Sequence, residues 1–173
     1  VLTGVNVGQY RQGDLDLVEL IAQLEEVEGI ERIRISSIEP TTITNALLDR
    51  MASSSKLCPY LHIPLQSADD SILSSMNRPY NAEEFTRLIQ RAVATVPHLG
   101  LGTDLMVGFP GETEEAFAHT LSLARELPFS YFHVFTYSQR PGTAATKLPD
   151  QVPIAVARER AKKLAELSRL KRL

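Results

Sequence analysis

The chain has 173 residues, of which 43% are hydrophobic and 23% charged, and its formal net charge is −3. This composition predicts a soluble globular chain with enough apolar side chains for one compact domain. No apolar run approaches the roughly 20 residues of a membrane-spanning helix, so a cytoplasmic location without a membrane partner is expected. The single cysteine, Cys58, excludes an internal disulfide framework and a metal site ligated only by cysteines of this chain.

Basic residues gather only near the end of the chain. The net negative charge gives no electrostatic case for nucleic-acid binding by the whole domain, because phosphate contacts need clustered lysine and arginine. Two interpretations of the basic segment stay open, namely a solvated helix face and a helix that faces RNA. Its basic residues are Arg158, Arg160, Lys162, Lys163, Arg169, Lys171 and Arg172, against Glu159 and Glu166.

Short β-rich segments alternate with helical patterns along the chain. The first residues, 1–3, are strand-like and start without an initiator methionine, so we expect the chain to be part of a longer protein. Each of the later strands is followed by a helical pattern, which indicates βαβ units and a parallel sheet. These strands are predicted at 33–37, 60–66, 101–107 and 131–137.

Helix starts are marked by capping residues. Asp16 with Glu19, and Asn81 with Glu84, have the spacing of a capping box. Acidic residues follow Pro110-Gly111 and suit the first turn of another helix. Pro153 suits the start of the last helix, whose apolar stripe is Ala157, Ala161, Leu164 and Leu167.

The strands have one apolar and one polar face, because alternate side chains point to opposite sides. A doubly wound sheet would need apolar residues on both faces, so a partial (βα) barrel with a polar interior fits better. A polar core that satisfies its own hydrogen bonds, without a ligand, is the alternative. The residues predicted to line the interior are Arg34, Ser36, His62, Gln66, Asp104, His133 and Tyr137.

Two glycine-flanked loops follow strands at the carboxyl end, where parallel α/β folds bind ligands. The first runs from Gly4 to Tyr10 and carries Asn6 and Gln9, and the second is Gly108-Phe109-Pro110-Gly111-Glu112-Thr113. Taken alone, the second loop is better explained as a turn that starts a helix. Neither loop is a dinucleotide or Walker motif, and no catalytic acid, base or metal ligand is predicted in this chain.

Taken together, these loops resemble the radical-SAM methylthiotransferases almost from end to end. The motifs that carry the resemblance begin at Gly4 (GVNVGQY), Arg34 (RISSIEP), His62 (HIPLQS), Met76 (MNR), Thr103 (TDLMVGFPGET) and His133 (HVFTYSQRPGT). RISSIEP and His-Val-Phe are most similar to the branch that acts on threonylcarbamoyl-adenosine beside the tRNA anticodon.

The resemblance implies a partial α/β barrel of TIM-like type and places residues 1–173 in the central and C-terminal part of the radical-SAM core. A CxxxCxxC loop and an N-terminal cluster domain would precede it, and an RNA-binding domain would follow. The implied cofactors are S-adenosylmethionine and two [4Fe-4S] clusters whose ligands lie outside this chain, with an electron donor, a sulfur donor and tRNA as partners. The residues that the resemblance assigns to S-adenosylmethionine are Asn6, Ser37, Gln66, Met106, Val107, Gly108 and Phe109.

Two further residues are expected to face the substrate. Glu39 is predicted to face the modified base, and the alternative is a carboxylate paired with a neighbouring arginine. Arg140 is predicted to contact RNA or cluster-bound sulfur, and the alternative is a surface salt bridge. Two other functions stay open, a ribosomal-protein aspartate methylthiotransferase and a non-catalytic α/β domain that binds a phosphate at the Gly108 loop. This chain by itself is expected to be inactive.

Overall fold

The computed structural model describes residues 1–172, which divide into two compact units. Unit 1 comprises Val1–Pro64 and Arg87–Leu101. Unit 2 comprises Leu65–Thr86 and the chain from Gly102 onward. None of the helices within residues 1–172 combines the length and the apolar character needed to cross a bilayer.

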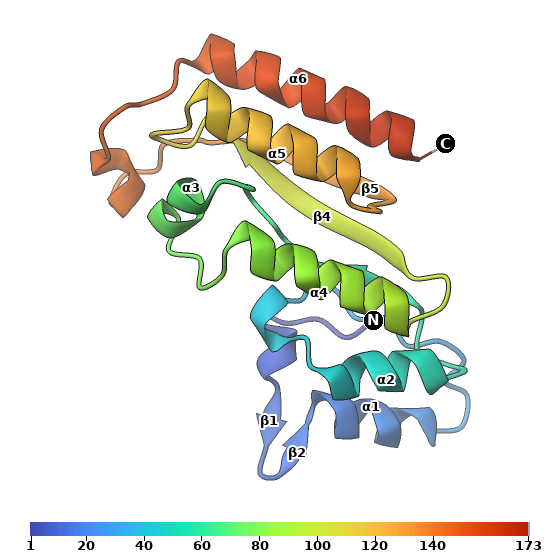
Figure 1. Ribbon diagram of the computed structural model, residues 1–173. Coiled ribbons are helices and arrows are strands. Elements are labelled where there is room, and N and C mark those ends of the chain that lie inside the picture. The colour runs from blue at the N-terminus through green and yellow to red at the C-terminus, as the bar shows by residue number, and fades with distance from the viewer. Residues whose placement is uncertain (173) are drawn as a thin grey trace. The chain divides into compact units, whose positions relative to one another are not determined.

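Unit 1 is built on short parallel bridges and two helices that lie against each other (Figure 1). Parallel bridges join Leu2 to Ile35, Ile33 to Leu57 and Ser37 to His62, so the predicted strand 33–37 is a bridged segment rather than a regular strand. Its elements are η1 (Val7–Gln9), β1 (Arg11–Gln12), β2 (Leu15–Asp16), α1 (Leu17–Glu25), η2 (Pro40–Thr42), α2 (Asn45–Ser53) and β3 (Tyr60–His62).

The capping box at the start of α1 is confirmed. Asp16 accepts hydrogen bonds from the backbone N–H groups of Val18 (2.8 Å) and Glu19 (3.0 Å), and Glu19 accepts one from Asp16 N (2.9 Å). The same reciprocal pair joins Asn81 and Glu84 ahead of α4 (Ala82–Thr95), at 2.8 and 3.0 Å. The hairpin of β1 and β2 was not predicted, since its two-residue strands carry no alternating pattern.

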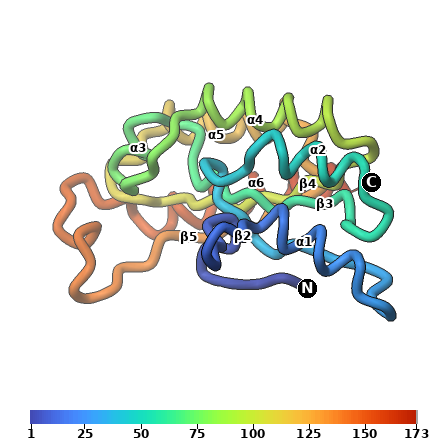
Figure 2. Tube along the Cα trace, turned by 90° about the horizontal axis from the view of Figure 1, so that it is seen from below, coloured from blue at the N-terminus to red at the C-terminus, as the bar shows by residue number. Residues whose placement is uncertain are grey.

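Unit 2 holds most of strand β4, strand β5 and two long helices, α5 and α6. Strands β4 (Gly100–Val107) and β5 (Tyr131–Thr136) pair in parallel, with Asp104 opposite His133. Helix α6 (Ile154–Lys171) packs on β5 and runs beside α5 (Glu114–Glu126), as Figures 1 and 2 show. The remaining elements are α3 (Asp70–Ser75) and η3 (Ala144–Lys147).

The predicted alternation of strand faces is confirmed at 33–35 and 104–107, whereas residues 61–65 of the predicted strand 60–66 are all buried. In unit 1, Ile33 and Ile35 are buried while Arg34 between them is exposed. In unit 2, Leu105 and Val107 are fully buried, whereas Asp104 and Met106 are half-buried. The parallel β4–β5 ladder with its helices confirms the α/β class, and the strands of residues 1–172 do not close into a barrel. A polar interior shared by all the predicted lining residues stays a prediction.

Several cations of the basic C-terminal segment take part in the packing of unit 2. Arg160 is buried, the ammonium of Lys171 donates to the carbonyls of Arg125 (2.9 Å) and Leu127 (2.8 Å), and Arg172 lies over the Tyr131 ring. Other cations of the segment, Arg158, Lys162 and Arg169, are exposed. The solvated and the RNA-facing interpretations of this helix both stay predictions.

The start of α3 is held by a carboxylate with several donors. Asp69 accepts hydrogen bonds from the backbone N–H groups of Ser71 and Ile72 and lies 3.1 Å from His119 Nδ1 on α5. Burial alone would raise the pKa of Asp69, but hydrogen bonds from Ser71, His119 and the backbone hold this pKa below its usual 3.8. Stabilisation from this carboxylate is therefore present above pH 3.8 and is lost as the pH falls through the folded-state value.

Replacing Asp69 with asparagine is expected to lower the free energy of unfolding at pH 7 by about 0.5–1 kcal/mol, since the cap survives and only the charge is lost. The difference from wild type should shrink below pH 3.8, where the wild-type carboxylate is progressively protonated. Urea unfolding at pH 7 and pH 3 measures both values. A difference that is equal at the two pH values would contradict a charge effect, and Asp49→Asn, at an exposed position of α2, is the control.

Candidate functional site

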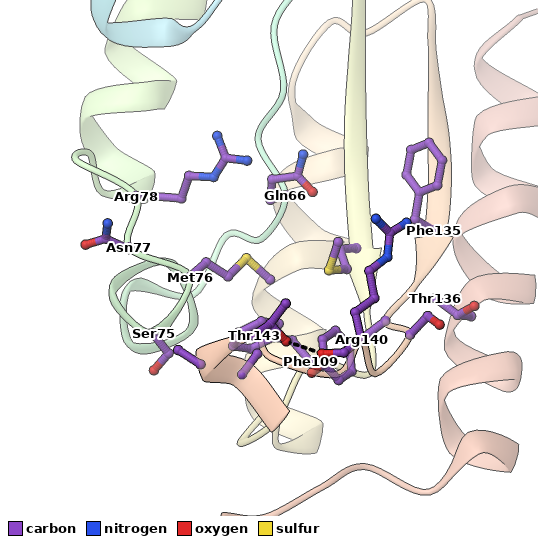
Figure 3. Close-up of a pocket in the computed structure, with 15 residues that line it drawn as sticks. Gln66, Ser75, Met76, Asn77, Arg78, Phe109, Phe135, Thr136, Arg140 and Thr143 are labelled. Atoms are coloured by element: carbon purple, nitrogen blue, oxygen red, sulfur yellow. Dashed lines mark hydrogen bonds between the residues drawn. The ribbon is translucent and has the colours of Figure 1, made fainter. Parts of the chain in front are cut away.

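The largest hollow described within unit 2 is a cavity of about 520 Å³ at the carboxyl ends of β4 and β5. Figure 3 shows its lining, which comes from chain segments far apart in the sequence. Its volume lies in the range of small-molecule sites. The lining residues are Gln66, Ser75, Met76, Asn77, Arg78, Met106, Phe109, Phe135, Thr136, Tyr137, Ser138, Arg140, Thr143, Ala144 and Ala145.

Two buried polar atoms on the cavity wall lack a partner. Gln66 Oε1 and the hydroxyl of Tyr137 form no hydrogen bond within residues 1–172. A buried polar atom without a partner costs about 1–3 kcal/mol, so a ligand or water that supplied one would stabilise this wall. The wall can therefore accept a polar ligand edge.

The backbone holds both of these residues in place. Gln66 has a positive φ of 69°, and its N–H and carbonyl are bonded to Asp104 O and Met106 N of β4, each at 2.8 Å. Tyr137 N–H donates to Val107 O at 2.8 Å. The ring of Tyr137 meets Phe109 edge to face, with the centroids 5.3 Å apart. These contacts fix the direction of both side chains without using their polar atoms.

Met106 and Phe109 supply the apolar wall of the cavity. Phe109 belongs to a buried cluster with Ile72 and Ala116, against which Met76, Met106 and Tyr137 are packed. Two flexible methionine side chains beside aromatic rings form an adaptable surface for a planar or irregular ligand. The cavity thus combines an apolar body with a few polar groups, as small-molecule sites usually do.

The loop after β4 is held by a buried carboxylate. Gly108 has a φ of 77°, a conformation that side chains with a Cβ rarely adopt. Its N–H donates to Glu112 Oε2 at 2.6 Å, and the Glu112 side chain is 1% exposed. This bond closes the loop that carries Phe109 to the cavity wall.

Arg160 of α6 neutralises this carboxylate. Its Nη1 donates to Glu112 Oε2 at 2.7 Å and to the Glu112 carbonyl at 2.9 Å, and its Nη2 donates to Glu114 Oε2 at 3.1 Å. Burial raises the pKa of Glu112 above its usual 4.5, while the N–H of Gly108 and the guanidinium of Arg160 counteract this rise. The pair ties α6 to the Gly108 loop.

The residues of unit 1 that were predicted to bind the cofactor or to face the substrate are Ser37, Asn6 and Glu39. Ser37 lines a smaller hollow with Arg34, Ser36, Tyr60 and His62, where the Arg34 guanidinium lies 4.0 Å from the centre of the Tyr60 ring. Asn6 precedes η1, and its Oδ1 is buried without a hydrogen-bond partner among residues 1–172. Glu39 is half-buried at the start of η2.

Among the predicted residues of unit 2, four line the cavity and two do not. Gln66, Met106, Phe109 and Arg140 come together there. Val107 is fully buried and points away from the cavity, because it follows Met106 on the strand and alternate side chains face opposite sides. Gly108 lines a separate hollow beside α6.

A comparison with protein families identifies the chain. Residues 1–124, well over half of its length, match the model of the Radical SAM superfamily. The chain belongs to the Radical SAM superfamily.

Curated relatives are similar to almost the whole chain. The chain is 42% identical over 175 aligned residues to the tRNA-2-methylthio-N(6)-dimethylallyladenosine synthase of Mycobacterium ulcerans, covering 96% of this chain and 33% of the relative. The enzyme of the same name from Mycolicibacterium paratuberculosis is also 42% identical, with 34% of it covered. The radical-SAM chain therefore spans about a third of the length of these relatives.

One solved structure to which the chain is similar is that of coproporphyrinogen III oxidase (HemN) from Escherichia coli, a Radical SAM enzyme. Its TM-score is 0.63 at 23% identity, with 85% of this chain and 34% of that chain covered. At this level of identity the match supports the fold alone. The α/β fold with a parallel sheet is thus confirmed for this radical-SAM chain.

The sequence analysis missed several residues that line or support the unit 2 cavity. Met76, Arg78 and Thr143 line the cavity, and Glu112 with Arg160 holds its loop, although none was assigned a site role. One signal was available for Arg160, because it lies three residues after Ala157 and four before Leu164 and so shares their apolar helix face. A charged residue within an apolar stripe indicates a buried ion pair.

Proposed function

We propose that this chain is part of the core of a tRNA methylthiotransferase that adds a methylthio group to C2 of an N6-modified adenosine next to the anticodon. The main support for this function is the 42% identity, over 96% of the chain, to relatives named tRNA-2-methylthio-N(6)-dimethylallyladenosine synthase. The activity belongs to the longer protein, since the chain spans only about a third of these relatives.

The cavity of unit 2 fits S-adenosylmethionine as the cofactor. Its volume, its apolar wall and the two unpartnered buried atoms of Gln66 and Tyr137 suit a nucleoside with polar edges. When bound, S-adenosylmethionine supplies the carbon radical that this superfamily uses. Gln66 would accept a hydrogen bond from the ligand, and Met106 and Phe109 would exclude water from it.

The residues of this chain do not fit an iron-sulfur cluster. A [4Fe-4S] cluster is held by several cysteine thiolates, and the chain contains one cysteine, Cys58, which is half-buried. We propose that the ligands of both clusters lie in other segments of the longer protein, as do the contacts with the electron donor and the sulfur donor. No step of the reaction is assigned to Cys58.

Two observations differ on the N6 substituent of the adenosine. The segments at Arg34–Pro40 and His133–Thr136 favour the threonylcarbamoyl group, which stays our sequence-based prediction. The printed names of the relatives specify a dimethylallyl group instead. Both substituents lead to the same kind of product, a methylthio group on an N6-modified adenosine, and this shared product is the one that we propose.

Deleting the gene for the longer protein is expected to remove one methylthio-nucleoside from tRNA completely. Digested tRNA from the deletion strain and its parent is compared by mass spectrometry for both methylthio-nucleosides. Loss of the threonylcarbamoyl form supports the first substrate, and loss of the dimethylallyl form supports the second. A deletion strain with both methylthio-nucleosides intact would sink the proposed function, and re-introduction of the gene is the control.

A further inference from the structure

We propose that Arg140 binds a backbone phosphate of the RNA substrate at the mouth of the unit 2 cavity, with Arg78 across the cavity adding positive charge. This inference rests on the proposed function and assigns the contact to a residue of the core. It differs from RNA binding by the basic helix α6, several of whose cations are used in packing.

The charged residues of the cavity lining are all basic. The chain has a net charge of −3, yet the lining contains two arginines and no acidic residue. A cleft with charge of one sign and apolar walls concentrates the electric field and attracts ions of the opposite sign. The lining of the unit 2 cavity therefore favours an anion, although the whole chain is acidic.

Arg140 has a fixed backbone and an exposed side chain. Its carbonyl accepts hydrogen bonds from Thr143 N (3.2 Å) and Thr143 Oγ1 (2.8 Å), in a turn that Gly142 completes with a φ of 85°. The backbone is therefore held, whereas the exposed guanidinium has no hydrogen bond or ion pair within residues 1–172. Arg160 shows the contrast, because its guanidinium is bonded to two carboxylates.

Arg78 reaches the cavity from the opposite wall. It follows Asn77, whose φ is 57°, and its N–H donates to Leu73 O at 3.0 Å, so the end of α3 sets its position. In Figure 3 the Arg78 and Arg140 side chains lie on either side of Gln66, toward the same end of the cavity. The planar guanidinium of Arg140, with several donors, matches the oxygens of a phosphate, and the charge of Arg78 adds to the attraction.

Replacing Arg140 with methionine in the full-length protein is expected to weaken binding of an anticodon stem-loop RNA about tenfold at moderate salt. The slope of log affinity against log salt concentration should fall by about one, since one phosphate contact is lost. Arg78→Met is expected to act in the same direction. Fluorescence anisotropy of a labelled stem-loop over a series of salt concentrations measures both quantities.

Arg158→Met is the matched control, because Arg158 is an exposed arginine of the same unit that does not line the cavity. Thermal unfolding of each variant checks that the fold is kept. Binding of S-adenosylmethionine, measured by equilibrium dialysis, separates the two sources of an anion, the RNA phosphate and the carboxylate of the cofactor. Unchanged cofactor binding with weakened RNA binding supports the proposal.

Two outcomes would overturn it. One is a loss of cofactor affinity in Arg140→Met with unchanged RNA affinity, which would assign the arginine to the cofactor carboxylate. The other is an RNA affinity and salt slope equal to those of Arg158→Met. These measurements need no turnover, so they are independent of the nucleoside analysis. If the tRNA of the deletion strain were unchanged while RNA still bound through Arg140, only the proposed function would be refuted.

Discussion

Replacing Arg160 with methionine is expected to lower the free energy of unfolding by about 3–5 kcal/mol. The Arg160 and Glu112 side chains are 7% and 1% exposed, so removing the cation leaves a buried carboxylate without its charge partner. Methionine keeps much of the side-chain length, which limits the cavity left behind. Urea unfolding followed by circular dichroism measures the change.

A pH series distinguishes this effect from general loss of packing. The pKa of Glu112 is already raised by burial, and losing Arg160 should raise it further. The pKa of Glu112 is higher in the folded protein than its usual value of 4.5, so this carboxyl group favours the folded state below pH 4.5. The stabilisation is lost as the pH rises through the pKa of Glu112 in the folded protein. Arg160→Met should therefore regain stability relative to wild type as the pH is lowered toward 4.5.

The control for this prediction is Arg158→Met on the exposed face of the same helix, which should change stability by less than about 0.5 kcal/mol. A loss in Arg160→Met as small as in this control would refute a structural role for the pair. Where Arg160→Met is too unstable to purify, Glu112→Gln with Arg160→Met removes both charges. That double variant should be more stable than Arg160→Met alone.

Replacing Gly108 with alanine is expected to lower the free energy of unfolding by about 2–5 kcal/mol, the second large effect. The backbone there has a φ of 77°, which costs an alanine roughly 1–2 kcal/mol. An added Cβ would also lie 2.6 Å from the Cβ of Ala157 on α6, and such overpacking costs typically 1–3 kcal/mol. Thermal and urea unfolding measure the sum.

Two further variants separate the backbone cost at Gly108 from the cost of the clash with Ala157. Gly142 has a φ of 85° with no atom within 4 Å of an added Cβ, so Gly142→Ala should show only the backbone cost. Adding Ala157→Gly to Gly108→Ala removes the clashing methyl group and should restore part of the stability. Equal losses in Gly108→Ala and Gly142→Ala would contradict the close approach of α6 to the loop.

Much of the secondary structure was predictable from local patterns. The alternation in 101–107 and 131–137 predicted β4 and β5, and the capping residues Asp16 and Asn81 predicted the starts of α1 and α4. Local signals suffice here because strand periodicity and helix caps act within a few residues. The segment 33–37 was less regular than predicted, since its pairing depends on partners distant in sequence.

The cavity was predictable only in part. Gln66, Met106, Phe109 and Arg140 were assigned ligand roles through the family resemblance, and the structure brings these four together. Met76 and Arg78 were not assigned, because nothing in a short polar segment after a helix shows which wall it will form. Their place follows from how the turn after α3 is packed.

The sequence by itself determined the place of β4 and β5, the starts of α1, α4, α5 and α6, and the glycine loop after β4, while the family followed from the resemblance of its motifs. The structural properties depend on side-chain periodicity, helix caps and the backbone limits of glycine and proline, which are local. Only the tertiary structure decided that Arg160 neutralises Glu112, that Ala157 excludes any side chain at Gly108, and that two arginines share one cavity. Burial changes the energy of a charge by several kcal/mol, and burial is a property of the packed chain rather than of any segment in it.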